Sequence, residues 1–166
     1  MQKILISACL LGEPVRYDGT GFLLAFKILN HWQHEGRLVA ICPEISGGLP
    51  VPRPPAEISR GDGTAVIGGK ALITNTKGND VTEAFLKGAN KALETANKNG
   101  IRMAILKSRS PSCGNAQIYD GSFEKNLKNG QGVTAALLEM NTIKVFNELE
   151  ISEAIEFLKL LEMNHP

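Results

Sequence analysis

Short apolar runs alternate along the chain with stretches of helical periodicity, and this alternation limits the possible folds more than any other feature. The apolar runs are continuous, which is typical of strands buried on both faces of a parallel sheet. They predict strands at residues 4–6, 38–41, 102–106 and 143–146. Apolar side chains spaced three and four residues apart predict helices at residues 21–35, 80–100, 132–140 and 152–163.

Strands that alternate with helices predict an α/β fold, here a three-layer, doubly wound and mostly parallel sheet. One insertion interrupts the pattern, because residues 64–67 and 70–74 flank Gly68-Gly69, a strong signal for a β-hairpin. A length of 166 residues, 43% of them hydrophobic, fits a single domain over residues 1–166.

The charge balance excludes one large class of ligands. A formal net charge of +1 argues against stable nucleic-acid binding, which normally shows as an excess of lysine and arginine. No apolar run is long enough to cross a bilayer, and residues 3–7 are too short for the apolar region of a secretory signal. We therefore expect a cytoplasmic protein that binds a small molecule.

Cys9, Cys42 and Cys113 each follow a predicted strand. Parallel sheets of this class bind ligands in a crevice outside the carboxyl ends of their strands, so the three cysteines should meet in one site. A single buried cysteine is often only a small apolar side chain. That explanation is less satisfactory when all three lie at strand ends.

Convergent thiolates bind soft metals, and the choice is between zinc and an iron–sulfur cluster. Zinc would need a fourth ligand from His31, His34 or His165, which the pattern places on a solvent-facing helix end or in the terminal tail. We favour a cluster held by three cysteines, which leaves one metal position open for substrate. Spacing alone does not separate this cluster from zinc.

The loop at residues 107–114 holds two cations, three hydroxyls, a proline and a cysteine, a composition suited to presenting groups to a ligand. A cluster bound by three thiolates is anionic, so nearby cations could offset its charge and orient substrate oxygens. The candidate cations are Arg16, Arg53, Lys107 and Arg109.

Glu44 lies shortly after the second cysteine and could act as a general acid or base if burial raised its pKa, or could simply pair with an arginine. Ser108, Ser110 and Ser112 could donate hydrogen bonds to a cluster or a substrate, although serine also serves ordinary turns. Ser110 is the strongest of the three candidates because Pro111 restricts the loop that presents it.

Three motifs carry a resemblance to a known family. They are residues 7–12 (SACLLG) with 15–19 (VRYDG), residues 42–44 (CPE) with 48–57 (GLPVPRPPAE), and residues 107–114 (KSRSPSCG). With these motifs the chain resembles the thiouracil desulfidase family over most of its length.

The resemblance implies an iron–sulfur enzyme that removes sulfur from a thiolated nucleobase such as 2-thiouracil. It implies that Cys9, Cys42 and Cys113 hold a [4Fe-4S] cluster whose fourth iron is free to bind the thiocarbonyl sulfur. It also implies that Glu44 and Ser110 handle protons while water replaces the sulfur.

The alternative is a non-catalytic interaction module that binds zinc or a cluster. Such a module has little need for Glu44, Ser110, Lys107 and Arg109 beside its ligands, so the orientation of these side chains separates the two hypotheses. Residues 46–60, rich in glycine and proline, predict an extended wall of the same crevice.

Overall fold

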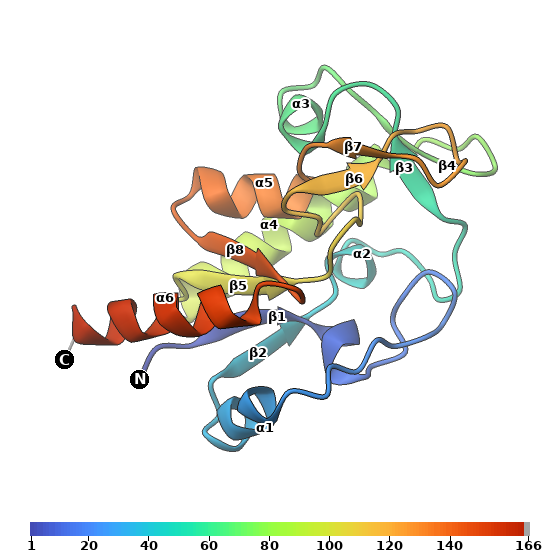
Figure 1. Cartoon of the computed structure of the whole chain (residues 1–166). Coiled ribbons are helices and arrows are strands. Elements are labelled where there is room, and N and C mark those ends of the chain that lie inside the picture. Colours follow the sequence, from blue (N-terminus) through green and yellow to red (C-terminus); the bar gives the residue numbers. More distant parts are fainter. Residues whose placement is uncertain (165–166) are drawn as a thin grey trace.

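Four parallel strands form the central sheet of the computed structural model, which describes residues 1–164 (Figure 1). Their order in the sheet is β2-β1-β5-β8. The strands are β1 (Ile4–Ser7), β2 (Leu38–Ile41), β5 (Met103–Leu106) and β8 (Lys144–Asn147). All four lie where the apolar runs predict them, which confirms the parallel sheet.

Helices cover both faces of this sheet. Because side chains alternate along a strand, Ile4 and Ile6 pack against one helical layer while Leu5 packs against the other. The first layer consists of α1 (Lys27–His34) and α6 (Ile151–Met163), and the second of α4 (Thr82–Lys98) and α5 (Val133–Met140). The predicted three-layer, doubly wound architecture is therefore confirmed. No helix within residues 1–164 is both long and apolar enough to cross a membrane.

The first predicted helix is shorter than its apolar spacing suggests. Residues 21–26 form an extended segment because the Phe22 N–H donates to Cys9 O at 2.7 Å and the Leu24 N–H donates to Leu10 O at 3.0 Å. These bonds fasten the segment to the short 3-10 helix η1 (Ala8–Leu11), and helix α1 begins only at Lys27. Tertiary hydrogen bonds here override a local helical pattern.

The predicted hairpin around Gly68-Gly69 is wrong in its first strand. Residues 63–67 form helix α3 (Gly63–Ile67), and the Asp62 carboxylate caps it by accepting from the Thr64 N–H at 3.1 Å. An antiparallel insertion is present, but it pairs β3 (Ala56–Ile58) with β4 (Ile73–Asn75). A short apolar run fits a helical turn as well as a strand, and the Asp62 cap decides between them.

Two further features complete the described fold. A second small antiparallel sheet pairs strand β6 (Gln117–Tyr119) with strand β7 (Leu127–Asn129). Helix α6 begins at Ile151, one residue before its predicted start, with Glu150 at its N-cap.

Helix α2 (Pro43–Ser46) is packed closely against α4. An added Cβ at Gly88 of α4 would lie 1.9 Å from Pro43 O, and one at Gly47 would lie 2.0 Å from Ala84 O. The absence of side chains at both glycines allows the two backbones to touch. This contact sets the position of the residues on either side of Pro43, which are Cys42 and Glu44.

Candidate functional site

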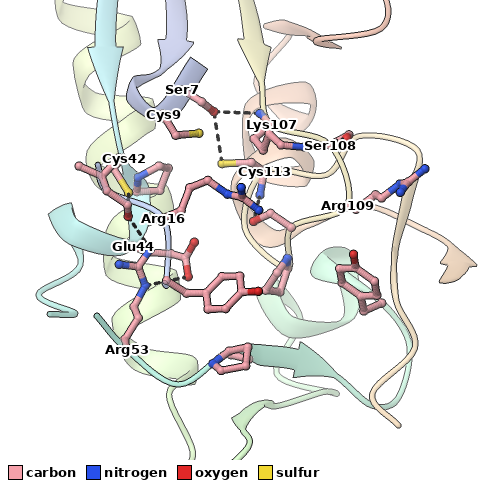
Figure 2. Close-up of a pocket in the computed structure, with 18 of the residues that line it drawn as sticks. Ser7, Cys9, Arg16, Cys42, Glu44, Arg53, Lys107, Ser108, Arg109 and Cys113 are labelled. Atoms are coloured by element: carbon pink, nitrogen blue, oxygen red, sulfur yellow. Dashed lines mark hydrogen bonds and ion pairs between the residues drawn. The ribbon is translucent and has the colours of Figure 1, made fainter. Parts of the chain in front are cut away.

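A pocket of about 450 Å³ opens at the carboxyl ends of the parallel strands (Figure 2). Its wall includes Ser7 of β1, Ile41 of β2 and Lys107 directly after β5, and the small sheets supply its outer side. In the strand order β2-β1-β5-β8, the connection from β1 leads outward to β2 at one edge of the sheet, and the connection from β5 leads outward to β8 at the opposite edge. The pocket therefore lies at the point where the winding direction of the sheet reverses, the usual ligand position in such folds.

All three cysteines line this pocket, and all three are free. Cys9 lies in η1 after β1, Cys42 lies between β2 and α2, and Cys113 lies in the loop after β5. Cys9 and Cys113 are buried and Cys42 is partly exposed. The expected meeting of residues a hundred positions apart is therefore confirmed.

The cysteines are close enough to influence one another's charge. Burial and the neighbouring Cys42 thiol raise the pKa of Cys9 to about 11. Burial also raises the pKa of Cys113, and Cys42 and Cys9 raise it further. The pKa of Cys42 is raised mainly by burial. Three thiolates in one buried site repel each other, so this donor set suits a positively charged metal centre that stabilises them.

The Cys113 loop lies across the start of α5. The first amides of this helix, at Val133 and Thr134, donate to Pro111 O at 2.9 Å and to Ser112 O at 2.8 Å. Ser110 closes the turn, since its Oγ accepts from the Ser112 N–H at 3.0 Å and from the Cys113 N–H at 3.1 Å. The loop is thereby held at both its backbone and its side chains.

Glu44 faces the same pocket and is paired with Arg53. Burial raises the pKa of Glu44, and the Arg53 guanidinium opposes that rise. Arg53 Nε donates to Glu44 Oε1 at 3.3 Å. Among residues 1–164, no hydrogen bond reaches the other carboxylate oxygen, Oε2, which leaves it available to a ligand.

Lys107 and Ser108 are held by a buried carboxylate that the sequence patterns did not single out. Glu148, just after β8, accepts from Lys107 Nζ, from the Ser108 N–H at 2.8 Å and from Ser108 Oγ at 2.6 Å. Lys107 Nζ also lies 4.6 Å from the centroid of the Phe22 ring. A signal was present, because Glu148 follows a predicted strand just as the cysteines do.

The comparisons with known proteins agree with this geometry. Residues 4–150 match the family described as 2-thiouracil desulfurase. The chain belongs to the 2-thiouracil desulfurase family. A solved structure titled [4Fe-4S]-dependent thiouracil desulfidase TudS is 44% identical, covers 96% of this chain and 99% of that one, and superposes with a TM-score of 0.88. YbbK of Bacillus subtilis (strain 168), described as uncharacterized, is 41% identical over 92% of this chain and 99% of its own length.

Family membership confirms the resemblance that the three motifs carry, and it confirms an enzyme family. Ten of the eleven candidate site residues line the pocket. They are Cys9, Arg16, Cys42, Glu44, Arg53, Lys107, Ser108, Arg109, Ser110 and Cys113. The exception is Ser112, which is fully buried with its Oγ 2.8 Å from Thr134 Oγ1, so its hydroxyl serves the core.

The remaining cations contribute unequally to this desulfurase-family site. The positive charge of Arg16 lowers the pKa of Cys9 and so opposes part of the rise that burial causes. The guanidinium carbon of Arg16 lies 5.9 Å from the centroid of the Phe22 ring. Arg109 has a left-handed backbone, with φ of 67°, and its side chain extends away from the three sulfurs in Figure 2. Tyr17, Tyr119 and Phe123 also line the pocket, and of these three only Tyr17 lies in one of the three family motifs.

The histidines do not complete a zinc site in the described part of the chain. His31 and His34 are exposed on α1, outside the pocket lining, and His165 lies outside the described residues. Within residues 1–164, no three His, Cys, Asp or Glu side chains are grouped tightly enough to hold one metal ion. The three cysteines bring sulfur donors to a common pocket, and sulfur is the donor that both iron–sulfur clusters and zinc accept.

Proposed function

We propose that this chain, acting as one domain over residues 1–166, is a [4Fe-4S]-dependent desulfidase. Its substrate would be a thiolated nucleobase such as 2-thiouracil, and oxygen from water would replace the thiocarbonyl sulfur. The observation that carries the proposal is the convergence of three free cysteines and Glu44 on one pocket, in a chain 44% identical to a thiouracil desulfidase.

Cys9, Cys42 and Cys113 are the residues that would hold the cluster, and they have the donor chemistry it requires. When bound, a cluster with one iron free of protein ligands supplies a Lewis acid for the thiocarbonyl sulfur. Arg16 and Lys107 lie close enough to Cys9 to lower its pKa, so their positive charges also act on the thiolates that hold the anionic cluster.

Glu44 is the residue we assign to proton transfer. In the overall reaction a C–O bond forms, the C–S bond breaks, and the two protons of water leave with sulfur as hydrogen sulfide. A carboxyl group whose pKa is raised by burial can hold and release a proton nearer neutral pH than an exposed glutamate. Its Oε2 atom would exchange that proton.

Ser110 is assigned to orienting the substrate or passing a proton. Its oxygen accepts two backbone N–H groups, which leaves the hydroxyl hydrogen to be donated to a ligand in the pocket. The rival hypothesis, a non-catalytic metal module, predicts that such polar side chains turn away from the metal ligands. The pocket lining of Glu44, Ser110 and Lys107 supports the enzyme instead.

We further propose that the ligand is a small molecule rather than a nucleic acid, because a pocket of about 450 Å³ and a net charge of +1 suit the former. A reducing compartment such as the cytoplasm suits three free thiols.

The test is anaerobic reconstitution with iron and sulfide, followed by analysis of both elements and incubation with 2-thiouracil. We expect a coloured protein with equal iron and acid-labile sulfide that forms uracil and sulfide. Colourless protein, or zinc alone after anaerobic purification, would overturn the proposal. The Cys113→Ser variant is the matched control and should lose both the cluster and the turnover.

A further inference from the structure

Ser7 lies at the junction of the two central strands. It is the last residue of β1, with 3% of its surface exposed. Pairing between β1 and β5 runs as far as Ile6 and Ile105. One step beyond, the Ser7 hydroxyl oxygen accepts the Lys107 N–H at 2.9 Å. A side chain thus satisfies a backbone group where the sheet opens into the pocket.

The same hydroxyl donates to a cysteine. Ser7 Oγ lies 3.7 Å from Cys113 Sγ, and Figure 2 shows both bonds of this hydroxyl as dashed lines. Because the oxygen already accepts from Lys107, its hydrogen is left for the sulfur. This hydrogen bond opposes the effect of burial on the pKa of Cys113. Ser7 therefore stabilises negative charge on that sulfur.

Ser112 shows that this arrangement is specific. It is adjacent to Cys113 in the sequence and fully buried, yet its hydroxyl is paired with Thr134 Oγ1 at 2.8 Å. Of these two buried serines, the one distant in sequence is aimed at the sulfur. Ser112 is thus an internal control for the loss of a buried hydroxyl.

We propose that Ser7 is a positioning residue for the iron–sulfur cofactor, donating a hydrogen bond to the Cys113 sulfur and fixing that ligand through its own bond to the Lys107 amide. The inference rests on the cluster of the proposed function. A hydrogen bond to a ligating sulfur withdraws negative charge, so it favours the reduced cluster and raises the reduction potential. Outer-sphere partners of this kind also strengthen retention of the metal.

The test compares wild-type protein with the Ser7→Ala, Ser7→Thr and Ser112→Ala variants after anaerobic reconstitution. The readouts are the potential of the cluster by electrochemical titration and the rate of iron loss to a ferrous chelator. We expect Ser7→Ala to shift the potential to a more negative value and to lose iron about tenfold faster. Ser7→Thr, which keeps the hydroxyl, should stay near wild type, and Ser112→Ala should leave the potential unchanged.

An unchanged potential in a Ser7→Ala protein of wild-type iron content would overturn the inference while leaving the desulfidase intact. Equal shifts in Ser7→Ala and Ser112→Ala would overturn it too, because they would indicate general loosening of the core. If the Ser7→Ala protein does not hold a cluster, the Ser7→Thr variant is the deciding measurement, because it keeps the hydroxyl. Loss of the cluster in Ser7→Thr too would mean that Ser7 contributes only packing, which would overturn the inference. A wild-type protein without a cluster would contradict the proposed function itself.

Discussion

Arg53 Nε lies 3.3 Å from Glu44 Oε1, and only 4% and 19% of the two side chains are exposed. The other guanidinium nitrogens bind the main chain, Nη1 at Pro50 O (3.2 Å) and Nη2 at Val15 O (2.9 Å). The arginine is thus anchored to two separate segments while it holds one carboxylate oxygen. The ion pair therefore fixes the orientation of Glu44 in the pocket, and the Arg53 guanidinium limits the rise in the pKa of Glu44 that burial causes.

Replacing Glu44 by Gln should remove proton transfer and preserve the fold. Turnover of 2-thiouracil should fall by about 10²–10⁴-fold at unchanged iron and sulfide content. Burial raises the pKa of Glu44, so the change in rate that reports its titration should lie above pH 4.5 in the wild type. This limb of the pH–rate profile should be absent in the variant. Glu83→Gln, on the exposed first turn of α4, is the control. Unchanged turnover would remove Glu44 from the reaction.

Replacing Arg53 by Met leaves Glu44 in its buried position without a cation. Burial then acts unopposed on the pKa of Glu44, so its pH–rate limb should move to higher pH. The free energy of unfolding should fall by about 3 kcal/mol in urea titrations, because a buried pair loses one partner. Exposed Arg60→Met should change neither quantity. A limb at the wild-type pH would show that Arg53 does not control Glu44.

Replacing Ser110 by Ala should loosen the Cys113 loop. Two backbone amides lose their acceptor, which lowers the free energy of unfolding by about 1–3 kcal/mol. Because we assign the Ser110 hydroxyl to the substrate as well, turnover should also fall at temperatures where the variant is still fully folded. Thermal unfolding and kcat measured on the same preparation separate the two effects. Turnover equal to wild type would leave Ser110 a structural role only.

Replacing Glu148 by Gln should make the stability of the protein less dependent on acid pH. Although burial opposes it, hydrogen bonds from Lys107 and Ser108 hold the pKa of Glu148 below its ordinary value of 4.5. A carboxylate with a lowered folded pKa stabilises the fold above its unfolded pKa, and this stabilisation is lost as the pH falls through the folded pKa.

At pH 7 the wild type should therefore exceed Glu148→Gln by about 2 kcal/mol in free energy of unfolding. The difference should shrink as the pH drops below 4.5. Urea titrations between pH 7 and pH 3 measure it, with the exposed Glu156→Gln as control. A difference that stays constant with pH would mean that the charge of Glu148 contributes nothing.

Replacing Gly88 by Ala should displace helix α2. The new Cβ would lie 1.9 Å from Pro43 O, so either the backbone shifts or the helices separate. We expect a loss of about 3 kcal/mol in unfolding free energy together with lower iron content, because Cys42 and Glu44 flank Pro43. Lys91→Ala, on the exposed side of the same helix, should retain its cluster. Full iron content in Gly88→Ala would show that the site tolerates movement of α2.

Local patterns predicted the elements that are buried on both sides or strongly periodic. The four parallel strands and the long helix α4 fall within a few residues of their predicted bounds. Predictions failed where long-range hydrogen bonds compete with local preference, as at residues 21–26, or where a run is too short to show its period, as at residues 63–67.

The sequence by itself determined where the pocket lies and which thiols line it. The alternation of apolar runs predicts a parallel sheet, and ligands bind outside the carboxyl ends of its strands, so Cys9, Cys42 and Cys113 were expected to converge, as they do. Only the tertiary structure decided which polar groups serve the site. Ser7 points its hydroxyl at Cys113, while Ser112 points into the core. Glu148, just after β8 and 41 residues further along the chain, holds Lys107. These hydrogen-bond partners depend on the direction of each side chain and on close contacts between distant backbone segments. A pattern of residue types along the chain does not contain that information.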